Sequence, residues 1–193
     1  NHAGYYPDAV QMAMKLIVDP EPDLILGAQA VGEEGVDKRI DVIATAMAAG
    51  LTATDLMDLE LSYAPQFASA KDPVNMLGYV NENRATGEKA VQWHEVEALL
   101  AEGWTLIDVR TEGEYSRGAI PGSTLTTLDE LRDHVESLRD HRVIVTCRVG
   151  QRGHTAASIL TQSGIEVANL DGGYLTWQMG TAATTHPEVL TTA

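Results

Sequence analysis

The sequence predicts a two-part chain, in which an α+β part precedes an α/β part with an open parallel sheet flanked by helices. In residues 1–83, two apolar runs on either side of a proline-containing turn predict a hairpin, and a helical pattern follows. In residues 91–181, short apolar runs alternate with helical patterns, as is typical of parallel sheets. The polar residues 84–90 between them predict a linker.

The first part is predicted to hold a hairpin, two helices and a short strand. Residues 12–18 and 24–31 form the hairpin, because Pro20 and Pro22 interrupt any regular structure between them. Residues 35–49 have apolar side chains at helical spacing. Thr52 is a candidate N-cap for a second helix ending at residue 58, with Asp55 in its first turn. The alternating residues 59–63 predict a strand.

The second part is predicted to alternate strands and helices. Apolar spacing indicates helices at residues 93–101, 128–138, 155–163 and 175–179. Buried-type runs indicate strands at residues 105–109, 142–146 and 166–170. Residues 118–122 are a glycine- and proline-containing loop, and residues 182–193, rich in Thr and Ala, are expected to be a loose tail.

Composition limits the classes of partner. The chain has 28 acidic and 13 basic residues and a net charge of −15, which argues against nucleic acid or an anionic membrane as the main partner. No stretch approaches the roughly 20 apolar residues that a membrane-spanning helix needs. One cysteine cannot form an internal disulfide, which favours a cytoplasmic location. The six histidines show no ligand spacing, so no metal site is expected.

The single cysteine, Cys147, has the surroundings of a nucleophile. It ends a buried strand and is followed by a loop with Gly150 and then by a helix. The carboxyl end of a parallel strand and a helix N-terminus both favour an anion there, so we expect a reactive thiolate. No acid occurs between His141 and Ile165. This basic island predicts a site for a thiolate, a persulfide or an anionic sulfur donor.

Four stretches within residues 90–180 then resemble the rhodanese family of sulfurtransferases. In chain order they are Leu106-Ile107-Asp108-Val109-Arg110 with Glu114-Tyr115, Gly118-Ala119-Ile120-Pro121-Gly122-Ser123, Cys147 to Arg152, and Leu170-Asp171-Gly172-Gly173 with Trp177. Ala119 stands where the family usually has His. The match implies a rhodanese-like fold in residues 91–181.

The resemblance assigns roles to the residues of the loop. Cys147 would take a sulfane sulfur from thiosulfate, a persulfide or a polysulfide and pass it to a thiol. The outer sulfur would be cradled by the backbone N–H groups of the residues that follow, Arg148, Val149, Gly150, Gln151 and Arg152. Arg148 and Arg152 would attract the anionic donor. Asp108 and Arg110 are expected to hold the fold beside the site.

Two other interpretations remain open. Cysteine phosphatases also use a strand–loop–helix cysteine, but their loop places five residues before the arginine, whereas four separate Cys147 from Arg152. The shorter loop suits a sulfur atom better than a phosphate. The second alternative is a non-catalytic dimerisation and thiol-binding module. The intact Cys147, Gly150 and Arg152 argue against it.

The first part resembles the C-terminal dimerisation domain of flavin-dependent pyridine-nucleotide disulfide reductases, and most of all the branch of coenzyme A disulfide and persulfide reductases. The stretches that carry this match are His2-Ala3-Gly4-Tyr5-Tyr6-Pro7, Ile25 to Gln29, Gly35 to Asp41, Leu61-Ser62-Tyr63-Ala64-Pro65 and Ala70 to Asn75. Some members of this branch carry a rhodanese domain in the same order. The resemblance implies a homodimer in which Tyr5 (or the adjacent Tyr6) and Tyr63 reach the partner's active site.

The resemblance also implies a longer enzyme. Such reductases use FAD, NAD(P)H and coenzyme A, and bind their dinucleotides at G-x-G-x-x-G loops that this sequence lacks. The comparable run, residues 27–35, carries Glu33 and Glu34 where a phosphate-binding loop has Lys and Ser or Thr. We therefore expect the chain to be the C-terminal part of a reductase and to hold no cofactor itself. Its sulfur would pass to coenzyme A for reduction at the flavin centre.

Overall fold

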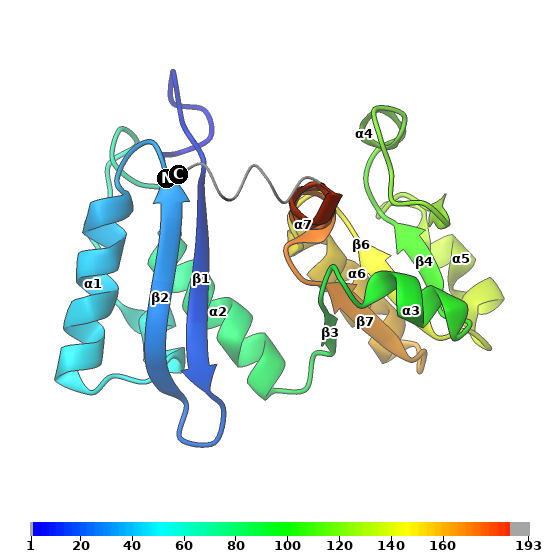
Figure 1. The fold of residues 1–193 in the computed structure, drawn as a ribbon, viewed down its shortest axis with the longest axis horizontal. Helices are drawn as coiled ribbons and strands as arrows, with labels where there is room; N and C mark the ends of the chain where they lie inside the picture. Colours follow the sequence, from blue (N-terminus) through cyan, green and yellow to red (C-terminus); the bar gives the residue numbers. More distant parts are fainter. Residues whose placement is uncertain (1, 186–193) are drawn as a thin grey trace. The chain divides into compact units, whose positions relative to one another are not determined.

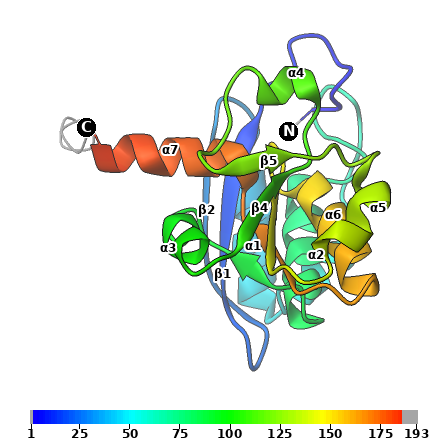
Figure 2. The same cartoon turned by 90° about the vertical axis from the view of Figure 1, so that its right-hand side faces the viewer.

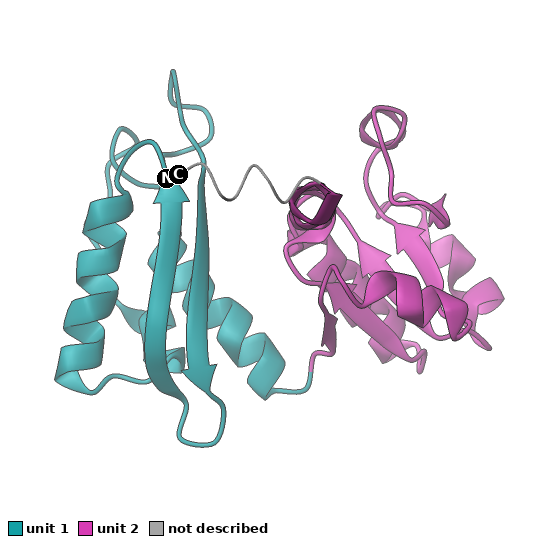
Figure 3. Cartoon of the chain, in the orientation of Figure 1, with its two compact units in different colours: residues 1–87 teal, residues 88–193 magenta. Residues whose placement is uncertain are grey.

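The computed structural model describes residues 2–185 and divides the chain into two compact units, residues 1–87 and 88–193 (Figure 3). Unit 1 is α+β, and unit 2 is α/β with a parallel sheet. The predicted fold class is confirmed. None of the helices described is long and apolar enough to cross a membrane.

Unit 1 is a two-stranded antiparallel hairpin packed against helices (Figure 1). Its elements are β1 (Met12–Asp19), β2 (Leu24–Gly32), α1 (Val36–Ala49), the 3₁₀ helix η1 (Thr54–Asp58) and α2 (Pro73–Ala85). The predicted hairpin and first helix are confirmed. One face of the hairpin joins the helices in a core whose large buried side chains are Ile25, Ile43, Leu56 and Val74.

Two predictions about residues 52–63 need correction. Thr52 and Asp55 do form reciprocal hydrogen bonds of 2.8 and 3.1 Å, but the helix that follows is 3₁₀ and begins at Thr54. Residues 59–63 form no strand. The apolar residues alternate because Leu59 and Leu61 both pack, partly buried, on the core. The Leu59 carbonyl accepts a hydrogen bond of 3.0 Å from the Asn75 side-chain amide instead of one from a neighbouring strand.

Helix α2 was not predicted, although its start has a clear sequence signal. Asp72 caps it by accepting the Val74 N–H at 3.1 Å, and Pro73 occupies the first turn. The Asp72 carboxylate also accepts hydrogen bonds of 2.8 and 3.3 Å from the buried Arg39 guanidinium. The helix continues to Ala85, into the stretch interpreted as a linker.

Unit 2 is built on a five-stranded parallel sheet with the order β3-β7-β6-β4-β5. The strands are β3 (Ala90–Val91), β4 (Thr105–Asp108), β5 (Ser123–Leu125), β6 (Val143–Thr146) and β7 (Val167–Leu170). The helices are α3 (Val96–Ala101), α4 (Glu112–Tyr115), α5 (Leu131–His134), the 3₁₀ helix η2 (Val135–Leu138), α6 (Gln151–Gln162) and α7 (Gly173–Thr185).

Helices cover both faces of this sheet (Figure 2). Leu131 of α5 and Leu160 of α6 pack with Val143 and Val145 on one face. Val96 of α3 packs on the other face, which Tyr174 and Trp177 of α7 also cover. Two covered faces explain why most residues of the strands are apolar. Strand β6 lies in the centre, so its carboxyl end is enclosed on both sides.

The four helices predicted in unit 2 all have different bounds. Helix α6 begins at Gln151, four residues before the predicted residue 155, and α3 begins at Val96 instead of residue 93. Residues 128–138 hold the short helix α5 followed by η2 instead of one long helix. Helix α7 begins at Gly173 and runs to Thr185, well beyond the predicted residues 175–179. The prediction of a loose tail is therefore wrong for residues 182–185, and residues 186–193 lie outside the described part.

Candidate functional site

Cys147 lies directly after the central strand β6 and in front of helix α6. Its side chain is buried, with the residue 1% exposed, and Sγ accepts the Gly150 N–H at 3.2 Å. Gly150 takes φ 99°, which side chains rarely allow, and so turns the chain into α6. Burial alone is also typical of an inert cysteine, but the N–H directed at Sγ is what a thiolate or persulfide needs.

The start of α7 holds the loop from the carbonyl side. The Tyr174 N–H donates to the Cys147 carbonyl at 2.8 Å, and the Leu175 N–H donates to the Arg148 carbonyl at 3.1 Å. A Cβ at Gly173 would lie 2.5 Å from that Cys147 carbonyl oxygen. The second glycine of the Gly-Gly motif, Gly173, is therefore required by the close approach of two backbone segments.

The loop keeps unused donors. Across residues 2–185, no hydrogen-bond partner is found for the backbone N–H groups of four residues, namely Arg148, Val149, Gln151 and Arg152. Gln151 and Arg152 belong to the first turn of α6, where such groups point out of the helix. These N–H groups are available to an anion at the end of the cysteine side chain.

The charge of Arg152 is already paired in the structure, which weighs against its predicted role in attracting a donor. Its guanidinium makes two hydrogen bonds of 2.7 Å to the carboxylate of Glu114 in α4. The Arg152 guanidinium lowers the pKa of Glu114 to about 2. In turn the Glu114 carboxylate raises the pKa of Arg152, and nearby Cys147 contributes less to that rise.

The basic island is smaller in space than in sequence. Glu114 neutralises Arg152, and Glu88 lies 2.6 Å from Nδ1 of His154. Both acids come from outside the island, so counting charges along residues 141–165 overestimates the positive charge. Arg148 is the arginine of the loop itself that keeps its charge unpaired in the described part of the chain.

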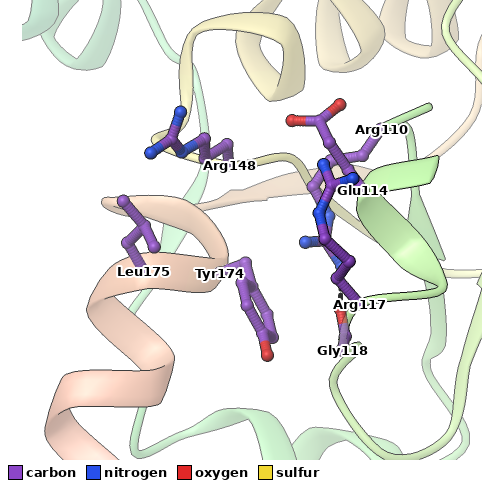
Figure 4. Close-up of a pocket in the computed structure, with 7 residues that line it drawn as sticks. All are labelled: Arg110, Glu114, Arg117, Gly118, Arg148, Tyr174 and Leu175. Atoms are coloured by element: carbon purple, nitrogen blue, oxygen red, sulfur yellow. Dashed lines mark hydrogen bonds between the residues drawn. The ribbon is translucent and has the colours of Figure 1, made fainter.

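A pocket of about 280 Å³ lies beside the loop (Figure 4). Its lining residues are Arg110, Glu114, Arg117, Gly118, Arg148, Tyr174 and Leu175. Cys147 does not line the pocket, but the next residue, Arg148, does. Figure 4 shows Arg110 and Arg117 on the side opposite Arg148, whose guanidinium points away from them.

The arginines of this pocket differ in their partners. The Arg110 guanidinium donates a hydrogen bond of 2.7 Å to the buried carboxylate of Asp108, and it lies 4.2 Å from the centre of the Tyr174 ring. These contacts agree with a structural role for Asp108 and Arg110. The side chains of Arg117 and Arg148 form no ion pair or hydrogen bond with any residue of 2–185. Arg117 and Arg148 are therefore the lining arginines with uncompensated charges, and the guanidinium of Arg148 points away from Arg110 and Arg117.

Tyr5 and Tyr63 meet in unit 1, although 58 residues separate them in sequence. Their hydroxyl oxygens are 3.1 Å apart, and the hydrogen bond with Tyr5 raises the pKa of Tyr63. Both rings are largely exposed. Tyr6 points its ring at His2 instead, with a centroid separation of 5.8 Å. A role for Tyr5 and Tyr63 in a partner's active site stays a prediction.

Several residues around Cys147 have contacts that the sequence motifs did not predict. Glu114, Arg117 and Tyr174 line the pocket. Asn169 donates a hydrogen bond to the Gly150 carbonyl of the loop and another to Glu88. Thr111 and Glu114 form a capping box that is readable in the sequence. The salt bridge between Glu114 and Arg152 corresponds to no recognisable sequence motif. The part of the chain described holds no cluster of side chains suited to a metal ion.

Comparison with known families defines both parts of the chain. Residues 92–179 match the family model of the rhodanese-like domain. Residues 1–73 match that of the pyridine nucleotide-disulphide oxidoreductase dimerisation domain. The chain therefore consists of a dimerisation domain of that oxidoreductase family followed by a rhodanese-like domain, as the motifs indicated.

The individual relatives are reductases. A coenzyme A disulfide reductase of Staphylococcus haemolyticus is 46% identical over 78 residues, which are 40% of this chain and 18% of that protein. The reduced CoADR-RHD of Bacillus anthracis is 49% identical, with a TM-score of 0.89 over 97% of this chain and 33% of its own. A NAD-dependent persulfide reductase from A. fulgidus is 35% identical, with a TM-score of 0.81 over 91% and 32%. The chain thus spans about a fifth of the curated relatives and a third of these solved chains.

Proposed function

We propose that unit 2 is a sulfurtransferase that carries sulfane sulfur as a persulfide on Cys147. The observation that supports this most strongly is the Gly150 N–H at 3.2 Å from Sγ, in a loop whose other N–H groups are unused. Such preorganised dipoles stabilise negative charge where it develops during transfer. The pocket beside the loop adds the unpaired charges of Arg117 and Arg148.

The transfer needs no external oxidant. The Cys147 thiolate attacks the outer sulfur of the donor, a Sγ–S bond forms, and the donor's S–S bond breaks with its electron pair leaving on sulfite or on a thiolate. A second thiolate then attacks the outer sulfur of the Cys147 persulfide, takes it as a new persulfide and releases the Cys147 thiolate. Over the full cycle, one sulfur atom moves from the donor to the acceptor, and Cys147 returns to its starting thiolate form.

We further propose that this chain works within a longer reductase. The reductases similar to it suggest a thiol acceptor such as coenzyme A, and FAD and NAD(P)H bound elsewhere in the whole protein. In that setting the dimerisation domain supports a homodimer whose Tyr5 and Tyr63 serve the partner's reduction site. A cytoplasmic location stays a prediction.

The arginines of the pocket provide a test of how the donor binds. We expect Arg117→Gln and Arg148→Gln each to raise the KM for thiosulfate several-fold, because each removes a positive charge that an anionic donor would meet. The effect should weaken as salt concentration rises. The measurement is sulfite release at increasing thiosulfate concentration, with Arg132→Gln on α5 as the control. Equal KM values for all variants would remove Arg117 and Arg148 from the binding site.

The two alternative functions, a thiol-binding module and a phosphatase, predict different results in activity assays. A thiol-binding module would bind coenzyme A without releasing sulfite, and a phosphatase would hydrolyse an aryl phosphate in a Cys147-dependent manner. Because four residues separate Cys147 from Arg152, and Arg152 is held by Glu114, we expect no phosphate hydrolysis. Sulfite release that persists in Cys147→Ser would contradict the proposal.

A further inference from the structure

We propose that Asn169 is a positioning residue for sulfur transfer, because it holds Gly150 in the conformation that directs its N–H at Cys147. This inference rests on the proposed function for its catalytic meaning, but its structural part stands on the contacts of Asn169. The residue lies in β7, beside the central strand β6, and is 9% exposed.

The Asn169 amide has a fixed orientation. Nδ2 donates to the Gly150 carbonyl at 3.1 Å and to Oε1 of Glu88 at 3.1 Å. Both partners are acceptors only, so the NH₂ end must face them. Oδ1 has no hydrogen-bond partner and faces Gly153, where an added Cβ would collide with it. Burying Oδ1 without a hydrogen bond lowers the stability of the fold. The two hydrogen bonds donated by Nδ2 offset this cost.

The bond to Gly150 acts on the loop through the backbone. The Gly150 carbonyl accepts from Asn169 and from the His154 N–H at 2.8 Å, so the direction of this carbonyl is set from two sides. Glycine at φ 99° has many alternative conformations. Holding the carbonyl limits the rotation of Gly150 about φ and ψ together, and so restricts the direction of its N–H, which lies 3.2 Å from Sγ.

Glu88 holds Asn169 from the other end. Its carboxylate accepts from Asn169 through Oε1 and lies 2.6 Å from Nδ1 of His154 through Oε2. The neighbouring Lys89 carbonyl accepts the Asn169 backbone N–H at 2.9 Å. A hydrogen-bonded series therefore runs from Glu88 through Asn169 and Gly150 to Cys147. All four residues belong to unit 2.

The test replaces Asn169 with Leu, which has a similar size but no donor. We expect Asn169→Leu to lower kcat for sulfite release about tenfold, with the KM for thiosulfate within twofold, because the donor pocket is untouched. Iodoacetamide should also alkylate the single cysteine about tenfold more slowly at pH 7. Amide hydrogen exchange should rise in residues 147–153 and not in β4 or α3.

Two further variants separate positioning from general damage. Glu88→Gln keeps an oxygen that can accept from Asn169, so we expect a smaller loss than in Asn169→Leu. Gln162→Leu, on the exposed end of α6, serves as the control and should match the wild-type chain. If circular dichroism shows that Asn169→Leu does not fold, Asn169→Ser, with a shorter hydroxyl donor, takes its place.

The outcomes are distinct. Slower sulfite release and alkylation with local exchange around Gly150 would support the inference. Alkylation and exchange equal to wild type in Asn169→Leu would overturn it. If the wild-type chain releases no sulfite, the proposed function fails, yet alkylation and exchange still decide whether Asn169 holds the loop.

Discussion

Individual side chains decide how much positive charge the candidate site offers. Arg152 and Arg110 are each held by a carboxylate, from Glu114 and Asp108, whereas Arg117 and Arg148 have no such partner in the described residues. A held guanidinium shapes the loop, while an unpaired one can bind a donor. This difference depends on Glu114, which is 38 residues from Arg152 in sequence.

The Glu114–Arg152 pair predicts a pH dependence of stability. The folded pKa of Glu114, about 2, lies below its ordinary value of 4.5, so the pair contributes above about pH 4.5 and its contribution is lost as the pH falls toward 2. Both side chains keep some exposure, so we expect Glu114→Gln to cost about 1 kcal/mol at pH 7. Urea unfolding from pH 7 to pH 2 measures it. A wild-type advantage that stays constant down to pH 2 would rule out the pair as its source.

At the scale of elements, the site is the meeting point of β6, α6 and α7. The carboxyl end of β6 delivers Cys147, the first turn of α6 supplies N–H groups, and the first turn of α7 binds the loop carbonyls. The α7 contact requires Gly173, whose φ is 61° and whose added Cβ would lie 2.5 Å from the Cys147 carbonyl oxygen.

The contact between α7 and the loop predicts an effect of Gly173→Ala. The new methyl group must push the loop backbone away from α7, so we expect a loss of roughly 2 kcal/mol or more in stability and of most sulfur transfer. Gly164→Ala is the matched control. Its φ of 79° brings similar backbone strain, but nothing lies within 4 Å of the added Cβ. Thermal unfolding and sulfite release measure both. Equal effects of the two substitutions would show that strain, not the contact, matters.

The elements also show what sequence patterns can predict. The hairpin was predictable because Pro20 and Pro22 mark its turn, and the strand before Cys147 because its residues are continuously apolar. Helix α2 was readable from Asp72 and Pro73 but was missed. The contacts of Asn169 with Glu88, 81 residues away, and of Glu114 with Arg152 follow from strand order and loop path, and no local pattern encodes them.

At the scale of the molecule, the outward face of the hairpin of unit 1 exposes apolar side chains on either side of the Lys15–Gln29 pair. Ile17, Leu26 and Val31 are 44%, 56% and 76% exposed, and they lie opposite the face that packs on the core. Such a face on a domain of the dimerisation family favours contact with a second copy.

The exposed hairpin face predicts that Leu26→Lys shifts the chain from dimer to monomer. A lysine there would place a charge in an apolar interface, which weakens association by several kcal/mol or more. Sedimentation velocity at several concentrations measures the change. Glu21→Lys in the hairpin turn is the control for added charge and should stay dimeric. A Leu26→Lys chain that sediments as wild type would place the interface elsewhere.

The central claim is that Cys147 carries sulfur, and an intact-mass spectrum tests it most directly. The chain is incubated briefly with thiosulfate and separately with polysulfide, alongside Cys147→Ser. We predict that the wild-type chain gains one sulfur atom, that cyanide removes it, and that Cys147→Ser gains none. A wild-type chain that gains no sulfur from either donor, or a Cys147→Ser chain that gains it equally, would contradict the account.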